Sequence, residues 1–160
     1  MVKKKVSSLK PFSKSLFPAL SGDIVEYDEL WSFVISKAYR IWIWIALCRR
    51  TKQVVAYHLG DRTKESFKIF YNKVPIDYAN CLSTSDGLEV YKIMRIYGHM
   101  MGKKKEGRTS QVEAFNTVLR QRLARLVRRT CAFSKSPEMH EIVIRWFIQE
   151  YNEEILSVGL

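Results

Sequence analysis

Several common features are scarce in this 160-residue sequence, and each absence narrows what the chain can be. The longest apolar run, residues 41–48, is far shorter than the roughly 20 residues that cross a bilayer, so no membrane-spanning helix is expected. Cys48, Cys81 and Cys131 lie far apart and form no CxxC pair. A disulfide framework and a zinc site of the usual spacing are therefore disfavoured, and a reducing cytoplasm fits the chain.

Familiar catalytic motifs are missing as well. The sequence contains no Gly-rich phosphate loop, no nucleophile elbow and no HExxH motif. Its three histidines have no metal-ligand spacing among themselves or with the cysteines. Hydrolysis of nucleoside triphosphates and the chemistry of serine or zinc hydrolases therefore have no support.

Acidic residues are absent from the start of the chain, where none precedes Asp23. The whole sequence has 27 Lys and Arg against 16 Asp and Glu, a net charge of +11. This excess favours a polyanionic partner, because each basic contact to a phosphate releases condensed counterions. We predict an extended basic arm over residues 1–22 and one domain over residues 23–160, for which the 47% hydrophobic composition supplies a core.

The hydrophobic pattern predicts three consecutive antiparallel strands, at residues 24–34, 41–47 and 53–59. The second of these is apolar on both faces, as in a buried central strand. Alternation along the first strand separates its side chains into two faces. One face carries Glu26, Asp28, Leu30 and Ser32, and the other carries Tyr27, Trp31 and Phe33.

Helices and strands alternate after residue 60. We predict a helix of about a dozen residues capped by residues 61–63, and a strand at residues 80–85. A short helix, a further strand and two long helices follow, at residues 88–94, 95–101, 111–129 and 137–156. This order predicts an α/β fold of the ribonuclease H-like (RNase H-like) type, in which a mixed sheet of three antiparallel strands and then parallel strands is flanked by helices.

Three acids are candidates for metal-dependent chemistry on nucleic acid, namely Asp28, Asp86 and Glu113. Gathered carboxylates repel one another, and Mg²⁺ or Mn²⁺ would neutralise them while keeping positions open for phosphate and water. Each acid also has a structural explanation: Asp28 as a charge on an edge strand, Asp86 as part of an Asp-Gly turn and Glu113 as a favourable charge at a helix start. Both interpretations stay open from the residues alone.

The helix predicted at residues 111–129 aligns several kinds of side chain. Its apolar stripe leaves Glu113, Asn116 and Arg120 along an adjacent face. Arginines further along this helix and a lysine cluster before it could follow a phosphate backbone, or could form a solvated basic surface. The predicted DNA-binding residues are Asn116, Arg120, Arg122, Arg125, Lys103, Lys104 and Lys105.

Six collinear segments resemble the DDE transposases of the bacterial insertion sequence one family, over residues 24 to 155. The arginine-rich helix is the most specific of them. The segments are DELWSFV (28–34), WIWIAL (42–47), GDR (60–62), TSDG (84–87), VEAFN (112–116) and LRQRLARLVR (119–128).

This resemblance implies an integrase-type catalytic domain in which Asp28, Asp86 and Glu113 hold Mg²⁺ or Mn²⁺. It implies hydrolysis at the ends of a mobile DNA element, followed by attack of the freed 3′-hydroxyl on target DNA. Arg120 matches a position that contacts DNA near the scissile phosphate, and Asn116 matches an amide of the same helix. A dimer or larger assembly on DNA, in the nucleoid of a prokaryotic cytoplasm, is also implied.

The chain departs from the family pattern in a few places. Gln111 stands where members often have His, and Cys48 stands where they often have Asp. Complete members carry an upstream zinc-binding and helix-turn-helix region, which this chain is expected to lack. Two alternatives follow: a truncated, non-catalytic remnant that binds DNA or regulates, and a general nuclease acting on RNA–DNA hybrids.

Overall fold

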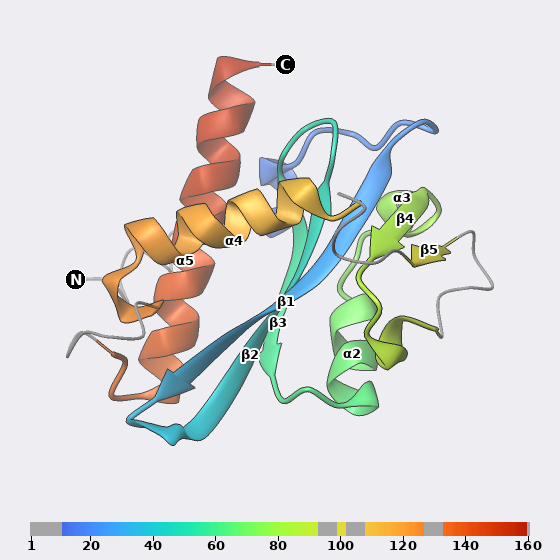
Figure 1. The fold of residues 1–160 in the computed structure, drawn as a ribbon. Helices are drawn as coiled ribbons and strands as arrows, with labels where there is room; N and C mark the ends of the chain where they lie inside the picture. The colour runs from blue at the N-terminus through green and yellow to red at the C-terminus, as the bar shows by residue number, and fades with distance from the viewer. Residues whose placement is uncertain (1–10, 93–98, 102–107, 127–132, 160) are drawn as a thin grey trace.

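Strand β1 (Ile24–Val34) lies at the centre of the sheet in the computed structural model (Figure 1). The structure describes residues 11–92, 99–101, 108–126 and 133–159. Within these residues five strands form one sheet in the order β3-β2-β1-β4-β5. β1–β2 and β2–β3 are antiparallel pairs, whereas β1–β4 and β4–β5 are parallel pairs. The other strands are β2 (Ser36–Cys48), β3 (Val54–Gly60), β4 (Leu82–Ser85) and β5 (His99–Met101).

Helices cover both faces of this sheet (Figure 1). Together with the strand order they confirm the predicted RNase H-like architecture. Among the described residues, no helix combines the length and apolar character needed to cross a membrane. The α-helices are α2 (Lys64–Tyr71), α3 (Ile76–Ala79), α4 (Ser110–Arg122) and α5 (Pro137–Val158), and the 3-10 helices are η1 (Phe12–Ser15) and η4 (Ala124–Leu126).

The two faces of β1 behave as its alternation predicts. Leu30 packs in a core with residues of α4 and α5, including Phe115 and Ile144. Tyr27 packs in a second core with residues of α2, and its ring lies 6.0 Å from that of Phe70. Burial of each large apolar side chain contributes about 1.5–3 kcal/mol, so these two cores fix which face each β1 side chain occupies.

Two helices start with a side-chain cap, and the cap of α2 lies within the predicted residues 61–63. The Thr63 side chain accepts a hydrogen bond from the Ser66 amide at the start of α2. Ser136 does the same for Met139 at the start of α5, where Pro137 takes the first helical position. These caps satisfy amide groups that have no partner within the helix.

The prediction of one helix over residues 111–129 is wrong. α4 ends at Arg122, and Leu123 adopts an extended backbone before the short η4 turn. The break lets Leu126 turn into the core, where it is 5% exposed. Residues 127–132 lie outside the described part of the chain.

One other predicted element is shorter in the structure, and two are described only in part. α2 spans eight residues rather than about a dozen, and α3 follows it after Pro75. The last predicted strand is described only as β5, because residues 95–98 lie outside the described residues. Residues 89–92 of the short helix predicted at 88–94 adopt 3-10 conformation.

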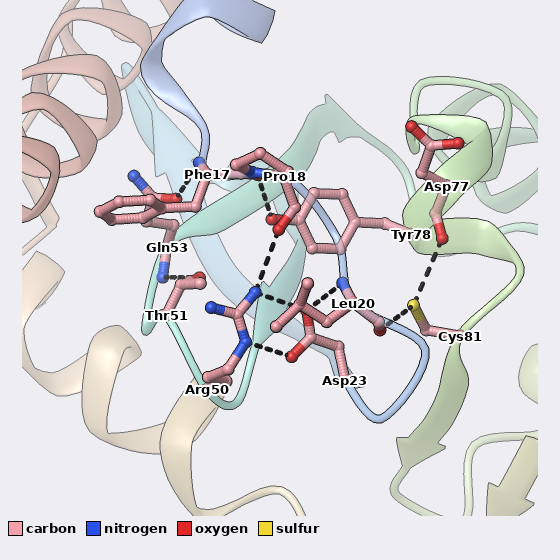
Figure 2. A network of polar contacts seen from close by, with 10 residues as sticks. All are labelled: Phe17, Pro18, Leu20, Asp23, Arg50, Thr51, Gln53, Asp77, Tyr78 and Cys81. Atoms are coloured by element: carbon pink, nitrogen blue, oxygen red, sulfur yellow. Dashed lines mark hydrogen bonds and ion pairs between the residues drawn. The ribbon is translucent and has the colours of Figure 1, made fainter. Parts of the chain in front are cut away.

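Residues 11–22, which fall within the predicted basic arm, contact α3 and the turn between β2 and β3 through polar groups (Figure 2). The Phe17 amide donates to Gln53 Oε1 at 2.9 Å, and the Tyr78 hydroxyl donates to the Phe17 carbonyl at 2.7 Å. Arg50 donates to both carboxylate oxygens of Asp23, at 2.6 and 2.8 Å, and to the Pro18 carbonyl at 3.0 Å. These contacts hold residues 11–22 against the domain, and the boundary at residue 23 stays a prediction.

Candidate functional site

Strand β1 extends further than its parallel neighbour. The register pairs Tyr27 with Ser85, where β4 ends, so Asp28 and Glu29 lie beyond the last paired residue. Asp86 follows Ser85 directly, at the same edge of the sheet. Side chains that follow the carboxyl ends of parallel strands collect at one edge, which is where sites form in open α/β sheets.

The structure brings five of the predicted site residues into one pocket of about 330 Å³. Asp28 comes from β1, Asp86 from the end of β4, and the other three from one side of α4. The five residues are Asp28, Asp86, Glu113, Asn116 and Arg120.

A buried glutamate holds α4 at this pocket. Glu26 is fully buried and accepts hydrogen bonds from the Gln111 and Val112 amides, at 2.9 and 3.0 Å. Its other oxygen accepts from Arg49 Nε at 2.7 Å. Because the first amides of a helix have no intrahelical partner and carry partial positive charge, a carboxylate there both caps and anchors the helix. Glu113, one residue after Val112, is thereby directed to the end of β4.

Asn116 joins α4 to Asp28 directly. Its Nδ2 donates to Asp28 Oδ2 at 2.7 Å. The residue is only 5% exposed, and its Oδ1 is buried without a hydrogen-bond partner among the described residues. A buried amide oxygen that lacks a donor costs free energy, so an added donor or cation would stabilise this position.

The ends of β4 and β5 are joined by a histidine. His99 lies between two serines of β4, at 2.7 Å from Ser83 Oγ and 2.7 Å from Ser85 Oγ. Asp86 then accepts from the Leu88 amide at 2.9 Å, which closes a turn. These contacts fix the backbone on both sides of Asp86.

The carboxylates of the pocket lie close enough to one another for their negative charges to repel. Burial, together with the smaller effects of the charges on Glu29, Asp86 and Glu113, raises the pKa of Asp28 to about 7. Burial and the charge of Asp86 also raise the pKa of Glu29, against the opposing effects of Tyr91 and Arg62. Oxygens of Asp28, Glu29 and Asp86 lie within 4.8 Å of one another. This oxygen-only set fits a hard divalent cation such as Mg²⁺ or Mn²⁺.

Glu29, Arg62 and Trp42 also line the pocket, and sequence reasoning missed them. Alternation places Glu29 on the face opposite Asp28, and only the pairing register shows the open edge that lets both reach one pocket. A signal for Arg62 was available, because it belongs to one of the family-like segments. Its guanidinium lies 4.5 Å from the centroid of the Trp42 ring.

Among the residues that the structure describes, the remaining predicted DNA-binding residues are Arg122 and Arg125, and neither lines this pocket. Arg122 lies beside Glu154, at 3.4 Å, and 5.8 Å from the centroid of the Phe147 ring. Arg125 lies on η4, beyond the break in the helix. Lys103, Lys104 and Lys105 fall outside the described residues. Their contact with DNA stays a prediction.

Comparison with known proteins agrees with this geometry. Residues 23–153 match the family described as IS1 transposase. The chain is 37% identical over 132 residues to the insertion element iso-IS1n protein InsB of Shigella dysenteriae, covering 80% of this chain and 95% of the relative. It is 34% identical over 149 residues to the insertion element IS1 9 protein InsB of Escherichia coli K12, covering 89% and 86%. The chain therefore belongs to the IS1 transposase family.

Proposed function

We propose that this chain supplies the catalytic domain of a DNA transposase, with Asp28, Asp86 and Glu113 as its metal-binding triad. One observation carries the proposal: three acids from distant parts of the sequence line a single pocket. Membership of the IS1 transposase family supports the same assignment. The domain would extend over residues 23–160, after the predicted arm.

We infer that the residues of the pocket have different roles in phosphodiester cleavage and strand transfer. Asp28, Asp86 and Glu113 would hold two divalent cations, Mg²⁺ or Mn²⁺. Bound cations of this kind activate the attacking oxygen and stabilise the leaving oxygen. Asn116 orients Asp28 through its 2.7 Å hydrogen bond, and Arg120 lines the pocket where a scissile phosphate would bind. The same arrangement would serve hydrolysis at an element end and the later attack by a 3′-hydroxyl.

DNA is the proposed substrate, and the net charge of +11 favours it. The basic residues predicted to contact its backbone are Arg120, Arg122, Arg125 and the lysines at 103–105. Joining two element ends to a target requires two active sites, so we propose a dimer or larger assembly on DNA. A DNA-reading region of another chain segment or protein would select the element ends, and the protein would act at the nucleoid of a prokaryotic cytoplasm.

A nicking and strand-transfer assay on DNA at low salt with Mn²⁺ tests this function. It compares the wild type with Glu113→Gln and with Glu141→Gln, which removes an exposed carboxylate on α5. We expect cleavage by the wild type and Glu141→Gln, and none by Glu113→Gln, with DNA binding equal in all three. Binding is measured separately by fluorescence anisotropy.

Other outcomes would overturn the proposal in distinct ways. Cleavage by Glu113→Gln would remove Glu113 from the triad. DNA binding without cleavage by the wild type would favour a non-catalytic DNA-binding remnant. A strong preference for RNA–DNA hybrids would favour a general nuclease.

A further inference from the structure

We propose that Glu29 is a fourth carboxylate ligand of this metal site, where it binds one of the divalent cations from the face of the sheet opposite α4. The proposal rests on the function proposed above and adds a residue to its site. It assigns to Glu29 a direct bond to the metal, beside Asp28 and Asp86.

The end of β4 makes this approach possible. Consecutive residues of a strand point to opposite faces, so Asp28 faces α4 while Glu29 starts from the face of Tyr27 and α2. A strand paired on both sides would keep these carboxylates apart. β4 stops at the partner of Tyr27, so both side chains can turn into the space at the open edge. Their oxygens and one of Asp86 come within 4.8 Å of one another there.

Hydrogen bonds from neighbouring side chains fix the carboxylate of Glu29, as they commonly do for carboxylates that bind metals. Its side chain is 2% exposed, and Oε1 accepts from Arg62 Nη2 at 2.5 Å and from Arg62 Nε at 3.1 Å. Oε2 accepts one hydrogen bond, from the Tyr91 hydroxyl at 2.8 Å. A carboxylate oxygen has two lone pairs, so Oε2 keeps one for a cation. Surrounding hydrogen bonds of this type orient ligating carboxylates.

A second observation points to a cation at the same place. Asn116 lines this pocket, is 5% exposed, and has a buried Oδ1 without a hydrogen-bond partner among the described residues. Amide oxygens are ordinary ligands of hard divalent cations. Glu113 lies at the same pocket but uses one oxygen to accept from Thr109 Oγ1 at 3.0 Å. Glu29, and not Glu113, belongs with Asp28 and Asp86 to the described group of carboxylates whose oxygens lie within 4.8 Å of one another.

Mn²⁺ binding to the full chain, measured by calorimetry without DNA, gives the first test. We expect Asp28→Asn to abolish binding, Glu29→Gln to weaken it by about tenfold or more, and Glu141→Gln to leave it unchanged. Glutamine keeps the shape of Glu29 and an oxygen for Arg62 or Tyr91. Wild-type affinity in Glu29→Gln would overturn the inference, whereas wild-type affinity in Asp28→Asn would overturn the proposed function instead.

Cadmium distinguishes a direct ligand from a residue that acts through Asp28, because loss of a supporting residue can also weaken binding by about 10–100-fold. A cysteine thiolate that binds Cd²⁺ produces a charge-transfer band in the ultraviolet. We expect this band in Glu29→Cys, measured as a difference from the wild type, and its absence in Glu141→Cys. Thermal unfolding with EDTA identifies variants that fail to fold. A folded Glu29→Cys without the band would show that Glu29 does not touch the metal.

Discussion

Two acids within six residues of one another have opposite environments in this molecule. Asp23, just before β1, receives two hydrogen bonds from Arg50, which hold its pKa below the ordinary value. Asp28, within β1, is partly buried beside three other acids, and its pKa rises to about 7. The first arrangement stabilises the fold through a matched pair. The second gathers like charges, and their mutual repulsion opposes folding until a cation binds.

Glu26 shows that burial alone does not make the environment of a carboxylate unfavourable. It is more deeply buried than Asp28, yet helix amides and Arg49 satisfy its oxygens. Among the residues that the structure describes, the carboxylates with a raised pKa are Asp28 and Glu29, and both line the pocket. Unfavourable arrangements that persist at one place in a well-matched fold are typical of functional sites.

Glu26→Ala should have the largest effect on stability. It removes a buried acceptor from Arg49 and from two amides of α4, and breaking a buried charged pair costs about 3–5 kcal/mol. Urea denaturation should show a loss of about 3 kcal/mol or more in the free energy of unfolding. The control is Glu141→Ala, on the exposed side of α5, which should stay within about 0.5 kcal/mol of the wild type. A loss below about 1 kcal/mol for Glu26→Ala would contradict its anchoring role.

Asp23→Asn should have an intermediate effect that depends on pH. Losing the charge-assisted bonds to Arg50 should cost about 1.5 kcal/mol at neutral pH. The lowered pKa of Asp23 makes its contribution present above the ordinary value of 3.8 and lost as pH falls through the folded-state value. Denaturation at a series of pH values should therefore show the wild type and variant converging in acid. A difference that does not change with pH would exclude the ion pair as its source.

Asp28→Asn also replaces an aspartate with asparagine, and without a metal ion it should have the smallest effect on stability of the three variants. With EDTA at pH 8 we expect stability equal to the wild type or higher by up to about 1 kcal/mol, because the raised pKa of Asp28 means that its ionisation opposes folding as pH rises from 3.8 toward 7. At a Mn²⁺ concentration 100 times the dissociation constant, the wild type should gain about 2.7 kcal/mol and the variant nothing. A clear loss of stability in EDTA would show that Asp28 has a structural role.

Much of this arrangement could be predicted from the sequence. Alternation alone placed Glu26, Asp28, Leu30 and Ser32 on the face of β1 that meets α4 and α5. Helical spacing placed Glu113, Asn116 and Arg120 on one side of α4, and all three line the pocket. These inferences succeed because local periodicity fixes which side chains share a face.

Two features depended on information that local periodicity lacks. The approach of Glu29 to Asp28 requires the pairing register, which shows where β4 stops. The break after Arg122 requires the tertiary packing of Leu126, because helix propensity alone favours continuing through residues 123–126. Both are consequences of contacts between distant segments.

The hydrogen bonds of Glu26 to α4 also set the time at which the pocket can form during synthesis. Gln111 and Val112 follow Glu26 by 85 and 86 positions in the sequence. Glu26 therefore leaves the ribosome long before its partners are synthesised. At about 5–20 residues per second, several seconds separate the two. The acids of β1 are therefore made without the helix that completes their site, and a nascent chain gains its pocket only after α4 has emerged.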